Sequence, residues 1–273
     1  MPNRPARAVL PLLLSLISLP VAAVVETPGE SVVTNITLKI EERDCTEAVE
    51  WLKYGLKQEY REVALMAGTM YDHGICVRRD WARAVGFYTQ AHAAGMARGA
   101  ERLAAGYADP ANGPDVAAAL WWASKTRSFR DPACRIAKEA VNDPDRFVAE
   151  LSAWKPERLA YCNYTAGVIM TIASELRYPD MAAAYSMGGK LTLRFLPGVP
   201  RIELQKNDSQ EFAMVGLING NWKRDRDSKE IAGSIEKAVT QLGDRALKRY
   251  PQPQGIPADS VIELNYTFEV LYK

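Results

Sequence analysis

The sequence has few of the residues on which catalysis and metal binding usually depend. Its two histidines, His73 and His92, have no neighbour at metal-ligand spacing. The motifs HExxH, CxxC and GxSxG do not occur, and Gly188-Gly189-Lys190 is followed by Leu191 where a phosphate-binding loop has Ser or Thr. We therefore expect no catalytic residue, no metal ion and no cofactor, and a protein that is not an enzyme. An envelope hydrolase would require a fold that brings a carboxylate and a nucleophile into one cleft.

The chain also lacks an excess of charge of either sign. Its 34 Lys and Arg nearly balance its 33 Asp and Glu, which gives a net charge of +1. Nucleic-acid-binding domains carry a concentrated basic face, so we expect no nucleic-acid partner. With 273 residues, 48% of them hydrophobic and 25% charged, the chain is long and apolar enough for two modest globular domains.

One long hydrophobic run is present, and it lies at the N-terminus. Arginines precede an apolar stretch from Ala8 to Leu19, and Pro20-Val21-Ala22-Ala23 follows it. This order is typical of a secretory signal peptide over residues 1–23, cleaved after Ala23. The alternative is an uncleaved inner-membrane anchor, because the uncharged stretch approaches the ~20 residues that span a bilayer. The prolines and the small residues at its end favour cleavage, and hence a periplasmic protein.

Beyond this run, a short pattern recurs about every 35 residues between Asp44 and Lys125. Each copy has an Asp, then an Ala one helical turn later, then an aromatic residue one turn further. The copies are Asp44, Ala48 and Trp51; Asp80, Ala84 and Phe87; and Asp115, Ala119 and Trp122. This spacing suits a helix that packs closely on a neighbour, and further helices are expected over residues 63–70 and 99–107. The period indicates helix pairs stacked into a solenoid, an architecture that mostly binds other molecules.

The middle copy carries a more specific set of residues. It reads Ala67-Gly68-Thr69-Met70-Tyr71, then Gly74, Val77, Asp80, Ala84, Phe87-Tyr88, Ala91 and Gly95. Residues 44–126 thereby resemble Sel-one-like helical repeats, which are relatives of the tetratricopeptide repeat. The resemblance implies protein interaction, frequently in bacterial envelopes, and no catalytic residue. Cys76 departs from it, since the family prefers a second loop glycine there, and residues 109–114 replace the glycine loop of the last copy.

All four cysteines lie after the hydrophobic run: Cys45, Cys76, Cys134 and Cys162. An even number in an exported chain predicts disulfides, and three pairings are possible. Cys45 begins one Asp-led helix, and Cys76 lies in the loop before the equivalent helix of the next copy. Stacked copies bring those positions together, so we predict Cys45 with Cys76 and, by remainder, Cys134 with Cys162. Four buried thiols in a cytoplasmic chain are the alternative.

The segments on either side of the repeats are less regular. Residues 24–43 mix Thr, Glu, Pro and Gly with a short alternating run, and we expect a linker or a loose strand there. Residues 127–175 are predicted to form a helical cap or connector, with helices over 132–141, over 144–154 and up to Leu176. An open solenoid end requires such a polar cap.

Beyond Tyr178 the hydrophobic residues alternate with polar ones. The apolar positions are Leu191, Leu193, Phe195, Ile202 and Leu204, and then Ile262, Leu264, Tyr266, Phe268 and Val270. Alternation predicts strands of an antiparallel sheet with one wet face. Asp227 and Glu230 have the spacing of a capping box for a helix over 231–246 that would cover the sheet. The predicted fold is α+β: an N-terminal all-α solenoid, then a small antiparallel sheet with one covering helix.

This last region, residues 176–273, resembles the C-terminal domain of TonB-type energy transducers. The residues that carry the resemblance are Tyr178-Pro179, Ala182 or Ala183, Gly188-Gly189, the strand through Leu191, Leu193 and Phe195, and an aromatic-rich closing strand through Phe268. The resemblance implies a periplasmic domain whose exposed strand edge accepts an extended segment of an outer-membrane receptor. True transducers have a long Pro-rich arm that this chain lacks, so we expect no force transmission across the envelope. A sheet that only dimerises or packs on the repeats is the alternative.

These patterns predict an exported, non-catalytic adaptor that binds envelope proteins, such as an outer-membrane receptor or an extended peptide segment. The alternative is a membrane-anchored, TonB-like transducer that energises transport through outer-membrane receptors; the protein would contact a membrane only if its N-terminal segment were retained. The predicted partner-binding residues lie on the concave side of the repeats, in a tryptophan pair and on the last strand: Arg98, Glu101, Arg102, Trp121, Glu263, Asn265 and Thr267. For Trp121 the alternative is half-burial within the fold.

Overall fold

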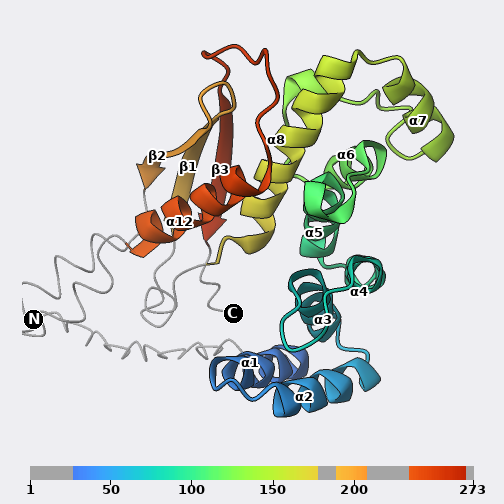
Figure 1. The fold of residues 1–273 in the computed structure, drawn as a ribbon, viewed down its shortest axis with the longest axis vertical. Coiled ribbons are helices and arrows are strands. Elements are labelled where there is room, and N and C mark those ends of the chain that lie inside the picture. The colour runs from blue at the N-terminus through green and yellow to red at the C-terminus, as the bar shows by residue number, and fades with distance from the viewer. Residues whose placement is uncertain (1–26, 178–188, 208–233, 269–273) are drawn as a thin grey trace, which may run out of the picture.

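The computed structural model describes residues 27–177, 189–207 and 234–268. The predicted signal peptide, Tyr178-Pro179, Gly188, the capping box of Asp227 and Glu230, and the end of the last strand lie outside the described residues. Within the described ranges the chain is helical first and ends in a small sheet with a helix, as predicted (Figure 1).

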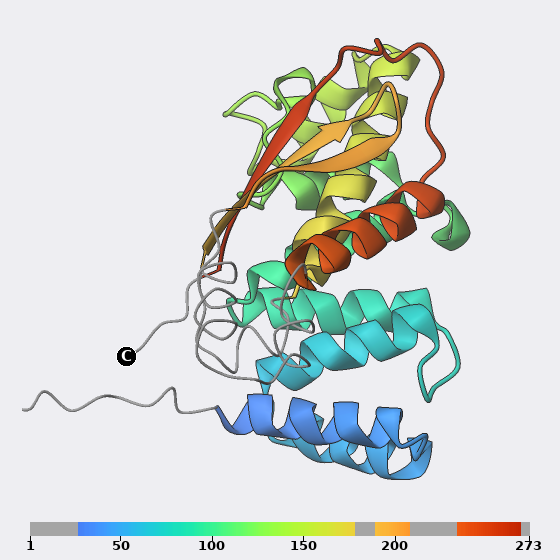
Figure 2. The ribbon, with the colours of Figure 1, turned by 90° about the vertical axis from the view of Figure 1, so that its left-hand side faces the viewer.

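Six helices form three packed pairs, which stack on one another so that the first two pairs lie below the sheet and the third reaches its level (Figures 1 and 2). The pairs are α1 (Pro28–Glu41) with α2 (Cys45–Lys57), α3 (Arg61–His73) with α4 (Trp81–Ala93), and α5 (Ala97–Ala108) with α6 (Val116–Ser124). The aspartate of each predicted copy caps the second helix of its pair. Asp44, Asp80 and Asp115 each accept the backbone N–H three residues further on.

The alanines of the pattern are completely buried where the pairs pack: Ala48, Ala84 and Ala119. The backbone repeats as well. The N–H of Asp80 donates to the carbonyl of Tyr71, and the N–H of Asp115 donates to that of Tyr107, both at 2.9 Å. The predicted arrangement of stacked helix pairs is therefore confirmed.

The aromatic residues of the pattern occupy the same place on each second helix and are all half-buried: Trp51, Phe87 and Trp122. Their ring contacts differ from pair to pair. Phe87 stacks on Tyr71 at a centroid distance of 5.6 Å, whereas Trp122 meets the His92 ring edge-on at 5.3 Å. The Trp51 ring meets that of Tyr54 edge-on at 5.9 Å, on the same helix. The repeat determines where the aromatic residue lies on its helix, and the neighbouring residues determine which ring it contacts.

The prediction of a linker or loose strand before the repeats is wrong, because residues 28–41 form helix α1. Thr27 and Glu30 form a capping box, and Pro28 occupies the first turn. Ile36 is completely buried while Leu38 is 48% exposed, which follows the helical period. An alternating run this short does not separate a period of 2 from one of 3.6. α1 therefore completes the first pair.

Both predicted disulfides are present, Cys45–Cys76 and Cys134–Cys162. The first joins the start of α2 to the loop before α4, and so links neighbouring helix pairs. Cys76 has a φ of 56°, a left-handed conformation that explains why a glycine suits this loop position. Two disulfides suggest an oxidising, extracytoplasmic location. No helix within the described ranges is long and apolar enough to span a bilayer.

The prediction of a helix over residues 132–141 is also wrong, since only a short 3-10 turn, η2 (Pro132–Cys134), forms there. Side chains from later in the sequence bind the backbone of this segment. Glu150 accepts the N–H of Ala137 at 3.1 Å, and Arg158 donates to the carbonyl of Ala133 at 2.9 Å. These hydrogen bonds satisfy a backbone N–H and a backbone carbonyl that a helix would have paired with its own backbone. The two helices predicted after it are present as α7 (Pro144–Ser152) and α8 (Pro156–Glu175).

α8 is a buried connector and not a polar cap, because most residues of its second half are buried. It packs on α5 and α6 and also on α12 (Ser234–Arg249). A Cβ at Gly167 would lie 2.5 Å from the ring of Tyr250, so this glycine allows the close approach. The Tyr250 hydroxyl donates to the carbonyl of Ala105 at 2.9 Å. One hydrophobic cluster runs from α5 and α6 through α8 to the sheet.

The predicted sheet has three antiparallel strands in the order β2-β1-β3. They are β1 (Gly189–Leu196), β2 (Arg201–Asn207) and β3 (Ile262–Phe268). Leu193 and Leu264 are register partners on the buried face, and Glu263 lies on the exposed face, as the alternation predicted. Helices α8 and α12 cover the apolar face, where Phe195 packs against Tyr164 with ring centroids 5.8 Å apart.

Candidate partner-binding groove

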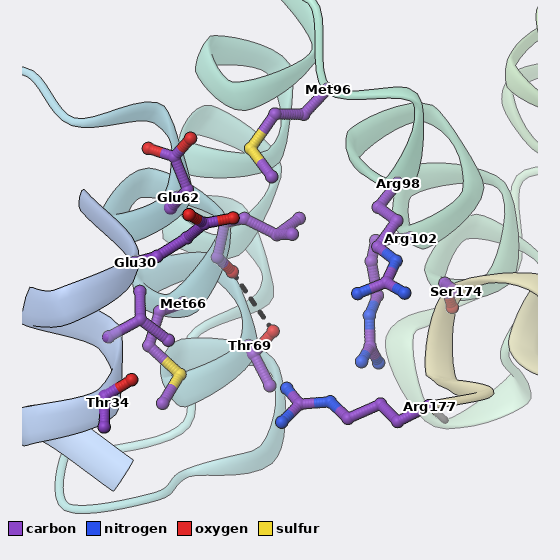
Figure 3. A pocket seen from close by; sticks show the side chains of 12 residues that line it. Glu30, Thr34, Glu62, Met66, Thr69, Met96, Arg98, Arg102, Ser174 and Arg177 are labelled. Atoms are coloured by element: carbon purple, nitrogen blue, oxygen red, sulfur yellow. Dashed lines mark hydrogen bonds between the residues drawn. The ribbon is translucent and has the colours of Figure 1, made fainter. Parts of the chain in front are cut away.

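A cavity of about 320 Å³ opens on the side of the repeats that α1, α3 and α5 share (Figure 3). We call it the repeat cavity. Its lining residues come from the first helix of every pair and from the end of α8: Glu30, Val33, Thr34, Glu62, Leu65, Met66, Thr69, Met96, Arg98, Arg102, Ser174 and Arg177. The surface of the first helices, where the sequence analysis placed partner binding, therefore contains a depression large enough to receive side chains.

The two sides of the repeat cavity carry opposite charges. Glu30 and Glu62 lie on the side of α1 and α3, while Arg98 and Arg102 lie across the opening on α5 (Figure 3). The guanidinium of Arg177 points into the space between them (Figure 3). Apolar side chains of α1 and α3 lie between the charged residues. A ligand here would meet cations on one side and an apolar surface on the other.

The two glutamates of the acidic side already have partners within the protein. Glu62 Oε1 pairs with Arg61 Nε at 2.9 Å. The carboxylate of Glu30 accepts the N–H of Thr27 at 2.8 Å as part of the capping box of α1. These partners hold both carboxylates and reduce their effect on a ligand.

The basic side is only partly neutralised. Arg102 Nη1 pairs with Glu175 Oε1 at 2.8 Å, which fixes this side chain against α8. Arg98 lies one turn earlier on the same face of α5, and neither it nor Arg177 forms an ion pair with any residue of the described ranges. Arg98 is exposed at the opening, but partial desolvation by the surrounding protein, together with the positive charges of Arg177 and Arg102, lowers its pKa, and Glu101 partly offsets this. An arginine stays charged under these conditions, so the cavity holds unmatched positive charge.

A second cavity, of about 510 Å³, lies between the end of α8 and one face of α12. We call it the α12 cavity. Its lining residues are Glu175, Leu176, Arg177, Ala238, Gln241, Leu242, Asp244, Arg245 and Lys248. Arg177 lines both cavities, so the two adjoin at this side chain, and we refer to them together as the groove.

A network of charged residues lies beside this groove and joins α12 to the repeats. Arg249 Nε lies 2.7 Å from Asp109 Oδ2, and its guanidinium also approaches Asp72 at 3.9 Å. Glu175 receives Arg102 at 2.8 Å and Arg245 at 3.4 Å. The network holds Glu175, two residues before Arg177, beside the groove.

Glu101 does not line the repeat cavity with the two arginines beside which it was predicted to bind a partner. Its side chain is only 8% exposed, and it accepts a hydrogen bond from Ser128 at 2.8 Å instead of lining the repeat cavity. Burial raises the pKa of Glu101, while Ser128 and the positive charges of Arg98 and Arg102 act in the opposite direction. Glu101 thus supports α5 from the inside.

The other predicted partner-binding residues lie away from the groove. The ring of Trp121 is half-buried against Phe147 at a centroid distance of 5.1 Å, with Lys125 Nζ 4.0 Å from its centroid. These contacts agree with the alternative of half-burial. On β3, the exposed predicted residues are Glu263, Asn265 and Thr267. They lie on the open face of a strand that ends the sheet formed by the described residues.

Both histidines contact other side chains of the fold. Nε2 of His73 lies 3.9 Å from Oδ2 of Asp72, and burial is the main reason that the pKa of His73 is lowered. His92 packs on the ring of Trp122. Within the part of the chain that the structure describes, no group of His, Cys, Asp and Glu has the arrangement of a metal site.

Arg177, Glu30 and Glu62 are site residues that no sequence pattern predicted. Arg177 follows a helix end that carried no motif, and Glu30 lay in the segment interpreted as a linker. A capping-box pattern, Thr27 with Glu30, is the signal that could have placed α1.

Comparison with known proteins returned no matching family model, no matching curated protein and no matching solved structure.

Proposed function

We propose that this protein is an exported periplasmic adaptor that binds other proteins without catalysis. The observation that carries the proposal is the groove from the repeat cavity to the α12 cavity, which crosses several elements and contains unmatched arginines. Stacked helix pairs commonly bind partners on the surface that their first helices share. The groove would be the main contact surface, with Arg98, Arg102 and Arg177 facing the partner.

The compartment is part of the same proposal. Two disulfides suggest an oxidising environment, and the N-terminal run has the composition of a signal peptide. We assign the mature protein to the periplasm, where it would meet envelope proteins. The repeats would be Sel-one-like and the sheet region TonB-like in origin, in keeping with the resemblance of their residues to those families.

The edge of β3 is the second proposed contact surface. β3 is a terminal strand of the described sheet, and backbone groups at a sheet edge can accept an extended segment of a partner. The exposed residues Glu263, Asn265 and Thr267 would then select among partners that add a strand. The apolar face of the sheet is covered by α8 and α12, so this binding would use the edge alone.

Capture of partners from an envelope extract tests the proposal. The exported protein is compared with three variants: Arg98→Ala with Arg177→Ala in the groove, Asn265→Lys with Thr267→Lys on β3, and Lys53→Ala on the outer helix α2. The proposal predicts that the same envelope proteins bind wild type and the Lys53→Ala control, and that at least one of them is lost from the groove variant. Identical capture by all four proteins, or no capture by wild type, would refute it.

A further inference from the structure

We infer that the groove binds an extended acidic peptide segment, with carboxylates of the segment at Arg98 and Arg177. This inference rests on the proposed function and names the chemistry of the partner. It follows from three properties of the groove, namely its length, its charge and its apolar lining.

The length of the groove favours a chain over a compact ligand. The repeat cavity and the α12 cavity have volumes of about 320 and 510 Å³, and they share Arg177. A compact ligand would fill one of them and leave the other open. An extended peptide can lie in both, with alternate side chains directed into the protein.

The charge of the groove favours an acidic segment. The cations that line it are Arg98, Arg102, Arg177, Arg245 and Lys248, and the acids are Glu30, Glu62, Glu175 and Asp244. Three of the four acids already have partners inside the protein: Glu30 caps α1, Glu62 pairs with Arg61, and Glu175 pairs with Arg102 and Arg245. Asp244 lies one turn before Lys248 on α12, a spacing at which the two attract each other.

Arg98 and Arg177 form no ion pair with an acidic residue among residues 27–177, 189–207 and 234–268, and of these acids only the buried Glu101 acts electrostatically on Arg98. Arginine binds carboxylates through paired N–H groups, and such charge-assisted hydrogen bonds are about twice as strong as neutral ones. Both side chains are exposed enough for a ligand to reach them. They are therefore the positions at which carboxylates of a partner would be held.

The lining of the groove favours a peptide over a free inorganic anion. Val33, Leu65, Met66 and Met96 line the repeat cavity, and Leu176 and Leu242 line the α12 cavity. A free phosphate would use none of these side chains. A peptide that combines acidic with aliphatic residues would use both kinds of surface, and methionine adapts to side chains of different shape.

Fluorescence anisotropy with labelled peptides tests the inference. Three short peptides share Leu and Ser positions and carry Glu, Gln or Lys at the remaining positions, and each is titrated with the exported protein. We expect the Glu peptide to bind at least ten-fold more tightly than the Gln peptide, and the Lys peptide to bind more weakly still. Arg98→Ala with Arg177→Ala should weaken binding of the Glu peptide at least ten-fold. Arg83→Ala, which removes an exposed arginine from the outer helix α4, should leave it unchanged.

Circular dichroism and thermal unfolding of each variant show whether it is folded before binding is measured. Equal binding of the Glu and Gln peptides, no binding of any peptide, or unchanged binding by the double arginine variant would overturn the inference. A labelled single-stranded oligonucleotide that binds as tightly as the Glu peptide would also overturn it, because the site would then select negative charge alone. None of these results depends on the capture of envelope proteins. Failure of that capture would refute the proposed function independently.

Discussion

Arg249 on α12 lies with its Nε 2.7 Å from Oδ2 of Asp109, in the loop that follows α5. The two residues are 140 positions apart in sequence, and Asp109 is only 5% exposed. The same guanidinium approaches Asp72, which is 2% exposed, at 3.9 Å. One arginine therefore compensates two buried carboxylates of the repeats, and it fixes the C-terminal helix on them.

Removal of this arginine should destabilise the whole chain. Arg249→Ala leaves Asp109 and Asp72 buried without their cation, and the loss of one partner of a buried pair typically costs about 3–5 kcal/mol. We expect a decrease of about 3 kcal/mol in the free energy of unfolding, measured by urea titration. The control is Arg201→Ala, which removes the 63% exposed partner of Glu203 and should change stability by less than about 0.5 kcal/mol. A loss for Arg249→Ala no larger than that of the control would contradict this role.

Glycine-to-alanine substitutions should show where the helices approach most closely. A Cβ at Gly68 would lie 2.4 Å from the Tyr88 ring, and one at Gly106 would lie 2.0 Å from that of Trp81. Overpacking of this kind typically costs about 1–3 kcal/mol. Gly86 on α4 is the matched control, because a Cβ there meets no atom within 4 Å, and Gly86→Ala should stabilise by up to ~1 kcal/mol through helix propensity. Thermal unfolding of the three variants gives the comparison, and a destabilised Gly86→Ala or a neutral Gly68→Ala would argue against the packing.

The buried Glu101 should make stability depend on pH in a defined direction. Burial raises its folded pKa above the ordinary value of 4.5, so the folded state disfavours the charged form. The resulting penalty is absent below pH 4.5 and grows as pH rises through the folded pKa. Glu101→Gln keeps an acceptor for Ser128 and should stabilise the protein at pH 7 by about 1 kcal/mol. The gain should disappear at pH 4, and an equal gain at both values would show that ionisation is not its cause.

The N-terminus should distinguish an exported protein from an anchored one. If the segment is a signal peptide cleaved after Ala23, the mature protein begins at Val24 and fractionates with soluble periplasmic proteins. N-terminal sequencing of protein recovered from each fraction measures this directly. A protein that starts at Met1 in the membrane fraction would instead favour the anchored transducer.

Local patterns in the sequence predicted most of the fold, because those elements depend on short-range periodicity. The Asp, Ala and aromatic spacing located the second helix of each pair, and alternation located the strands. The stacked arrangement also predicted Cys45–Cys76, since neighbouring copies bring those residues together. α1 was missed because five alternating residues fit a strand and a helix face equally well. The prediction of a helix over residues 132–141 failed because the side chains of Glu150 and Arg158, from later elements, bind the backbone of this segment.

The groove was less predictable than the fold. Arg98 and Arg102 could be placed together because they are four residues apart, which is the spacing of one helical turn, although the predicted helix began only at residue 99. Glu101 was placed with them, although its position on α5 turns it toward Ser128. Arg177 was not predicted, because its role depends on how α8, α5 and α12 meet. Contacts between elements this far apart in sequence are set by packing and leave no local pattern.

Site-specific photo-cross-linking tests the account most directly. A photoreactive phenylalanine derivative is placed at Met66, which lines the repeat cavity, or at Leu38, which is 48% exposed outside it, and each exported protein is irradiated in envelope extract. The account predicts that Met66 yields a discrete cross-linked protein that the acidic peptide displaces, and that Leu38 does not. The absence of a product at Met66, or the same product at both positions, would contradict it.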